Sequence, residues 1–143
     1  MSQGNGPITE RYNVNGDDFQ AAGGASSAMK KLLRSVGVPP EAIRRAAICM
    51  YEGEINMVIH ASGGEAAVSF DGEVITITLA DKGPGIENPQ LALKEGWSTA
   101  TDKIRDLGFG AGMGLPNMKR NSDELTIESV VGEGTAIVMK IRV

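Results

Sequence analysis

Four glycines alternate with other residues between Gly108 and Gly114, and a predicted helix, Leu115 to Asn121, follows at once. Glycine permits positive φ angles and a close approach of the backbone. A helix N-terminus offers unpaired N–H groups and a partial positive charge. Such a segment can seat a phosphate group, although an isolated glycine run is also typical of a flexible surface loop. Other segments of the chain decide between these interpretations.

Several common sites are excluded by residue type and spacing. A dinucleotide fingerprint needs a third glycine where Met113 or Leu115 stands, and a P-loop needs a Gly-Lys pair, which the chain lacks. One cysteine and one histidine exclude an ordinary zinc cluster. The net charge of -4 gives no indication of nucleic-acid binding. No apolar run approaches the roughly 18 residues of a membrane span.

The length of 143 residues predicts one domain. The polar, glycine-rich residues 1–7 are expected to be a disordered tail, and residues 8–143 to form the domain. A single cysteine, Cys49, cannot form an internal disulfide, and it is expected to pack in the core. These features predict a cytoplasmic protein.

Hydrophobic periodicity and turn signals predict a series of short elements. A strand is expected over 8–14, a helix from a cap at Asp17 or Asp18 to Ser35, a helix over 41–60, a hairpin of 66–70 and 74–79 around Asp71-Gly72, a short helix over 90–95, a helix over 115–121, and a hairpin of 124–130 and 135–143. The segregation of helices from strands favours an α+β fold. We expect a two-layer sandwich with a mixed, mostly antiparallel sheet.

Glu52 and Asn56 are candidate functional residues in the second predicted helix. They are four residues apart and share one face of the helix, whereas Glu54 would face elsewhere. A carboxylate and an amide carbonyl on one face can serve a hydrated Mg²⁺ and an attacking nucleophile. A solvated polar pair is the plain alternative. Gly53 favours the functional interpretation, because a glycine inside a helix costs stability unless something packs closely against it.

Asp81 follows the most regular predicted strand, within Asp81-Lys82-Gly83-Pro84-Gly85-Ile86. A carboxylate at a strand end can accept a hydrogen bond from the exocyclic amine of adenine. Gly83 and Gly85 would let the backbone bend against the base. The same residues are also typical of a simple turn.

In order along the chain, these segments resemble the Bergerat ATP-binding fold of the gyrase, chaperone, histidine-kinase and MutL (GHKL) superfamily. The resemblance covers about residues 8–143. Four motifs carry it: Glu52-x-x-x-Asn56 matches the N box, Asp81-x-Gly83-x-Gly85-Ile86 the first glycine box, Gly108 to Leu115 the second, and Gly132-Glu133-Gly134-Thr135 the closing Gly-x-Gly-Thr.

The resemblance implies a role for each matched residue. Glu52 would be the catalytic general base or water-positioning carboxylate, and Asn56 would hold Mg²⁺ beside ATP. Asp81 would read adenine. The remaining nucleotide-binding residues would be Gly83, Gly85, Ile86 and Thr135 around the base, and Gly108, Gly110, Gly112, Met113, Gly114 and Leu115 at the phosphates. Residues 98–107 would form a short lid.

Within this superfamily the chain resembles the small anti-sigma and stressosome switch serine/threonine kinases. Its only histidine, His60, lies in the N-box helix, and no separate helix carries a phospho-accepting histidine. The likeness implies an ATP- and Mg²⁺-dependent protein kinase acting on a STAS-type partner. The likeness also allows a sigma factor or a phosphatase as a further partner, and a homodimer, with no nucleic acid or membrane bound directly.

Two other functions stay open. Sporulation-type kinases tend to carry an arginine near the last Gly-x-Gly, whereas here that neighbourhood is glycine. A cation would have to come from Lys103, Arg105, Lys119 or Arg120. The chain could therefore be a non-catalytic, ATP-gated binding module. A stand-alone histidine-kinase-like ATPase domain is the third hypothesis.

Overall fold

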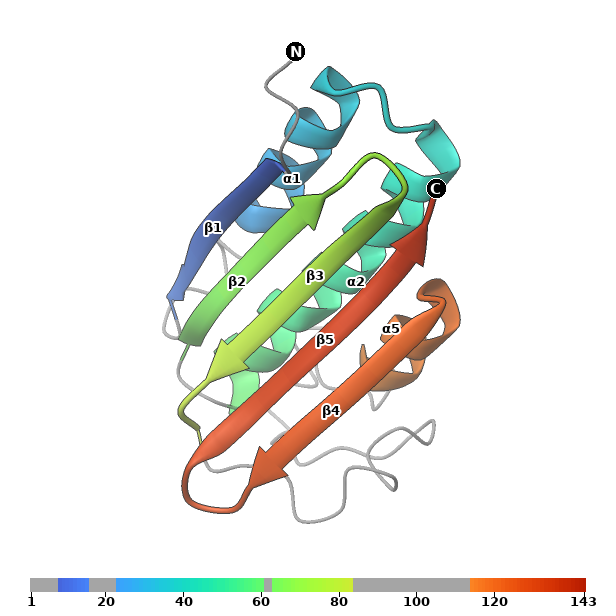
Figure 1. Ribbon diagram of the computed structural model, residues 1–143. Coiled ribbons are helices and arrows are strands. Elements are labelled where there is room, and N and C mark those ends of the chain that lie inside the picture. Colours follow the sequence, from blue (N-terminus) through green and yellow to red (C-terminus); the bar gives the residue numbers. More distant parts are fainter. Residues whose placement is uncertain (1–7, 16–22, 61–62, 84–113) are drawn as a thin grey trace.

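The computed structural model describes residues 8–15, 23–60, 63–83 and 114–143 (Figure 1). The elements in chain order are β1 (Ile8–Asn15), α1 (Gly24–Ser35), α2 (Pro40–His60), β2 (Gly63–Phe70), β3 (Val74–Asp81), α5 (Gly114–Asn121), β4 (Glu124–Val130) and β5 (Gly134–Arg142). The short helix expected over 90–95 lies outside the described residues.

The five strands form one sheet in the order β1-β2-β3-β5-β4, and α1, α2 and α5 lie together on one of its faces (Figure 1). This arrangement confirms the expected α+β two-layer sandwich. All four strand pairings within the described segments are antiparallel. The expectation of a mixed sheet is therefore wrong for this part of the chain, because each neighbouring pair of strands runs in opposite directions.

The core lies between the sheet and the helices. Alternate side chains of the two central strands are buried against the helical layer, as the period of two in a strand requires. They are Ile75, Ile77 and Leu79 of β3 and Ile137, Met139 and Ile141 of β5. The longest helix, α2, supplies the facing side chains Ala46, Cys49 and Met50.

The first helix begins later than the sequence predicts. It starts at Gly24, not at a cap provided by Asp17 or Asp18. Gly23 has φ of +102°, a left-handed conformation that interrupts a right-handed helix. The expected cap residues lie outside the described segments. Strand β2 also begins three residues earlier than predicted, at Gly63.

Gly53 lets α2 lie directly on the sheet. A Cβ added at this position would overlap the side chain of Leu79 on β3. The close approach expected from a glycine inside a helix is therefore made by the sheet. It fixes one turn of α2 against the end of β3.

Overpacking a core costs about 1–3 kcal/mol, and alanine regains roughly 1 kcal/mol in helix propensity. We therefore expect Gly53→Ala to destabilise the protein by a net amount of up to about 2 kcal/mol. Urea unfolding measures the change. Gly24→Ala is the matched control, because nothing lies within 4 Å of a Cβ there. Equal stability changes in the two variants would contradict the packing argument, as would a Gly53→Ala cost that is undiminished in a Leu79→Ala background.

Cys49 is an inert core thiol. It has no exposed surface, and burial raises the pKa of its thiol to about 12. At pH 8 the thiolate fraction is thus about a thousandfold lower than for a thiol at its ordinary pKa of 9.0. We expect no reaction of the folded protein with iodoacetamide at pH 8 and prompt reaction in urea, measured by mass. Alkylation of the folded protein at the rate of the unfolded chain would contradict this.

Candidate functional site

The helices α2 and α5 lie side by side and bring the N-box residues together with the end of the glycine run. Asn117 of α5 donates a hydrogen bond from Nδ2 to Glu52 Oε2 of α2 at 2.5 Å. One helical turn later on α2, Asn56 lies against Gly114, where an added Cβ would be 3.0 Å from Asn56 Oδ1. The predicted carboxylate, the predicted amide and the start of α5 therefore meet at one place.

The amide of Asn117 is held in a defined orientation. Arg120 donates from Nη2 to Asn117 Oδ1 at 2.7 Å. A guanidinium group only donates hydrogen bonds, so the amide oxygen must face it, and the NH₂ group is left to face Glu52. Asn121 also donates to the backbone carbonyl of Asn117 at 2.9 Å. The side chain that binds Glu52 is thus itself fixed by hydrogen bonds within α5.

Asn117 belongs to none of the motifs in the sequence. Its partner Glu52 is 65 residues away in the chain, so no local pattern links them. The only available signal was its position in the first turn of a helix that follows the glycine run. Arg120, one of the four cations considered, reaches this site through Asn117, while Lys103 and Arg105 lie outside the described residues.

A second cluster forms where β3 ends and β5 begins. Asp81 is the last residue of β3 and pairs in register with Thr135. Asp81 Oδ1 accepts a hydrogen bond from the backbone N–H of Gly83 at 2.9 Å. The hydroxyl of Thr135, nearly buried, lies 2.8 Å from that of Ser129. Asp81 and Thr135, two of the residues predicted to surround adenine, are thus neighbours on paired strands.

Two glycines let the backbones meet closely around Asp81. At Gly134, which has φ of +138°, an added Cβ would overlap the backbone carbonyl of Asp81. At Gly64 it would lie 2.6 Å from Sδ of Met57 and 3.1 Å from Cβ of Asp81. Met57 follows Asn56 on α2, so this contact joins the Asp81 cluster to the helix that carries Glu52.

The described structure places six predicted site residues in these two clusters: Glu52, Asn56 and Gly114 in the first, and Asp81, Gly83 and Thr135 in the second. Leu115 follows Gly114 on α5, and its side chain belongs to the core, with 8% exposure. Gly85, Ile86, Gly108, Gly110, Gly112 and Met113 lie outside the described residues.

Glu54, set aside in the sequence, has a structural role on the other side of α2. Its buried carboxylate accepts backbone hydrogen bonds from Gly23 and Ala25 at Oε2, at 2.9 and 3.2 Å, and from Ser26 at Oε1, at 2.8 Å. These N–H groups belong to the start of α1, where a helix leaves donors unpaired and favours negative charge. Glu54 therefore fixes α1 on α2. About 30 residues separate the partners along the chain, so no local sequence motif predicts the contact.

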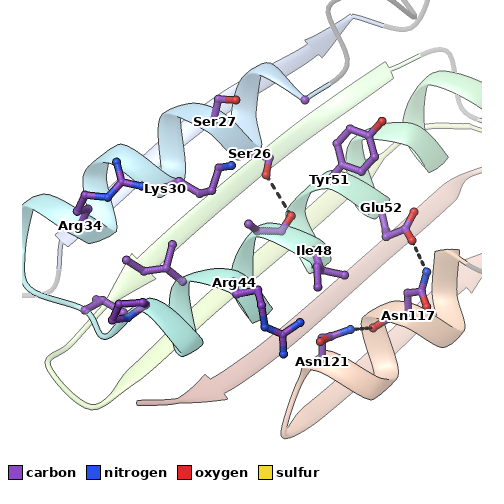
Figure 2. A pocket seen from close by; sticks show the side chains of 15 residues that line it. Ser26, Ser27, Lys30, Arg34, Arg44, Ile48, Tyr51, Glu52, Asn117 and Asn121 are labelled. Carbon is purple, nitrogen blue, oxygen red and sulfur yellow. Dashed lines mark hydrogen bonds between the residues drawn. The ribbon is translucent and has the colours of Figure 1, made fainter.

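An open groove of about 1010 Å³ runs along the outer surface of the helical layer (Figure 2). Each helix contributes one stripe of side chains at helical spacing. The stripes are Ser26, Ser27, Lys30 and Arg34 of α1; Pro40, Ile43, Arg44, Ala47, Ile48, Tyr51 and Glu52 of α2; and Asn117 and Asn121 of α5. Gly23, just before α1, and Val38, just before α2, also line the groove. The hydrogen-bonded pair Glu52–Asn117 thus faces the groove.

Comparison with known proteins gives a family match over most of the chain. The profile of the histidine kinase-like ATPase domain family matches residues 17–141. The serine/threonine-protein kinase RsbT of Bacillus subtilis is 40% identical over 63 residues, which are 44% of this chain and 41% of RsbT. The anti-sigma F factor of Priestia megaterium is 32% identical over 112 residues, 78% of this chain and 70% of that protein.

A further anti-sigma F factor, from Anoxybacillus flavithermus, is 33% identical over 100 residues, 70% of this chain. The match spans 62% of that protein, as against 41% of RsbT. Among solved structures, the SiaB-SiaC complex from Pseudomonas aeruginosa has a TM-score of 0.55 at 11% identity, over 94% of this chain and 89% of that one. This likeness concerns the fold. No helix in the described segments is long and apolar enough to cross a membrane.

We expect Glu54→Ala to lower the free energy of unfolding by at least about 2 kcal/mol, because hydrogen bonds to a charged group are worth roughly 1.5–3 kcal/mol each and buried donors would be left unpaired. Urea unfolding measures the loss. Glu54→Gln, which keeps one acceptor oxygen, should lie between Glu54→Ala and the unchanged protein. Glu41→Ala, an exposed carboxylate on the same helix, is the control and should change little. A Glu54→Ala variant as stable as this control would contradict the capping role.

Proposed function

This chain belongs to the histidine kinase-like ATPase domain family, and on that premise we propose that it is an ATP- and Mg²⁺-dependent protein serine/threonine kinase of the anti-sigma or switch class, acting on a STAS-type protein. Membership confirms the family expected from the four motifs. The names of the relatives, a serine/threonine-protein kinase and anti-sigma F factors, support the activity. The STAS-type partner, like any link to a sigma factor, is part of the proposal.

The observation that carries the proposal is the meeting of α2 and α5. It sets the Glu52 carboxylate and the Asn56 amide beside the N-terminus of the helix that follows the glycine run. An amide oxygen is a ligand that Mg²⁺ accepts, and a helix N-terminus favours phosphate. The missing side chain of Gly114 leaves Asn56 close to that N-terminus. These residues fit ATP together with Mg²⁺. When bound, ATP supplies the phosphoryl group.

The proposed roles follow from the positions. Glu52, with Oε2 engaged by Asn117, would use Oε1 to accept the proton of the partner's serine or threonine hydroxyl. The hydroxyl oxygen would bond to the γ-phosphorus as the bond to the β–γ bridging oxygen breaks and ADP leaves. Asp81 would accept a hydrogen bond from the adenine amine. The further nucleotide contacts are proposed for Gly83, Thr135, Gly85, Ile86 and the run Gly108 to Leu115.

The test is transfer of label from γ-labelled ATP to purified STAS-domain proteins of the host genome. We expect an acid-stable phosphate on serine or threonine. Glu52→Gln should lower the transfer rate at least about 100-fold, the usual contribution of a positioned general base, with binding of a fluorescent ATP analogue retained. Glu128→Gln, an exposed change on β4, should transfer normally. ATP binding without label on any of these proteins would overturn the kinase assignment.

Two other outcomes identify the alternatives. An unlabelled STAS protein whose affinity depends on ATP, and is unchanged by Glu52→Gln, would indicate a non-catalytic, ATP-gated module. The glycine-rich residues 131–134, which hold no arginine, favour this second candidate. An acid-labile phosphate on a histidine of another protein would instead indicate a stand-alone histidine-kinase-like domain.

A further inference from the structure

The groove on the helical layer has an apolar floor. The α2 stripe contributes Ile43, Ala47 and Ile48, and the ring of Tyr51 lies at its rim with 40% exposure. The side chain of Ser26 donates a hydrogen bond to the backbone carbonyl of Ala47 at 3.1 Å, which holds α1 and α2 together beneath the groove. The two helices that form the groove are thus fixed relative to each other.

One wall of the groove carries positive charge that no carboxylate of the described residues neutralises. Lys30 and Arg34 are four residues apart on α1, so their charges are adjacent and repel. Neither has an ion pair with a residue in the part of the chain that the structure describes. Arg44 on the α2 side differs, since it is held by Glu41 at 2.6 Å. The α1 wall therefore favours an anionic occupant.

We infer that this groove docks an acidic, amphipathic segment of the protein that the kinase phosphorylates. Apolar side chains of the segment would cover Ile48 and Tyr51, and its carboxylates would pair with Lys30 and Arg34. Apolar burial in the centre with charge pairing at the rim is the usual composition of a specific interface. The inference rests on the proposed function for the reaction. It adds the chemistry by which the substrate protein is selected.

The geometry separates the proposed point of reaction from the charged wall. The helices α1 and α2 run in opposite directions, with Lys30 and Arg34 along one side of the groove and Ile48 and Glu52 along the other (Figure 2). Ser26 of α1 is bonded to α2 through its side chain at Ala47 and through its backbone N–H at Glu54. Lys30 and Arg34 follow about one and two helical turns after Ser26, away from the Glu52 end of the groove. A substrate hydroxyl at Glu52 thus requires carboxylates further along the same face of the substrate, toward the Arg34 end.

The test is the double variant Lys30→Glu/Arg34→Glu with the STAS-domain protein that is labelled in the kinase assay. We expect KM for that protein to rise roughly tenfold or more, with kcat and the KM for ATP nearly unchanged, because reversed rim charges repel the docking segment. Raising the KCl concentration should raise KM of the unchanged kinase and not of the variant. Lys31→Glu is the matched control, since Lys31 is exposed on α1 and does not line the groove.

Binding is measured separately from phosphate transfer, by fluorescence anisotropy of the STAS protein, which carries a fluorophore, with the ADP-loaded kinase. Equal effects of the double variant and Lys31→Glu on binding and on KM would overturn the docking site while leaving the kinase assignment intact. Absence of label with normal, groove-dependent binding would overturn the kinase assignment alone.

A dimer that the double variant converts to a monomer, measured by light scattering, would make the groove a self-interface and overturn the inference. If the double variant is misfolded by circular dichroism, Arg34→Ala, an exposed single change, replaces it.

Discussion

The packing of α2 on β3, at the point where Gly53 lies on Leu79, sets the directions in which the neighbouring carboxylates Glu52 and Glu54 leave α2. Successive residues of a helix point about 100° apart. Once Gly53 faces the sheet, its neighbours are directed to different partners. Glu52 meets Asn117 on α5, and Glu54 meets the start of α1. One turn of helix therefore joins the sheet, the capping contact and the candidate reactive carboxylate.

The two carboxylates on this turn do different work because their surroundings differ. Glu54 is buried and accepts three backbone hydrogen bonds, which ties it to stability. Glu52 is only partly buried and faces an open groove, which leaves it accessible to a partner. The amide that holds Glu52 belongs to α5, the helix that begins at Gly114. A shift of α5 would therefore change the hydrogen bond between Asn117 and Glu52 without any movement of α2.

The fold was largely predictable from local signals. Asp71-Gly72 predicts the turn of the first hairpin, and in the structure Asp71 accepts hydrogen bonds from Glu73 and Val74 within that turn. The apolar period places α2 correctly to within a residue. The start of α1 was not predictable, because its cap is a carboxylate some 30 residues later and not a nearby aspartate.

The same division holds for the candidate site. Helical spacing, the end of a predicted strand and the order of the motifs indicated Glu52, Asn56, Asp81 and Thr135, and the structure places them on adjoining elements. The contacts that complete the site join residues far apart in the chain: Asn117 with Glu52, and Gly64 with Met57. Such contacts depend on how helices and strands pack, and a single sequence carries no periodic signal for them.

The arrangement around Gly53 also limits how this chain can vary in length. One residue inserted into or removed from the turn that holds Glu52, Gly53 and Glu54 would rotate all later positions of α2 by about 100°. The carboxylate that now caps α1 would turn away from it, and a side chain would meet Leu79 where glycine lies today. Length variation should instead collect in an exposed turn, such as residues 71–73. The turn of α2 that holds Glu52, Gly53 and Glu54 thus fixes the rotation of α2 relative to β3, α1 and α5.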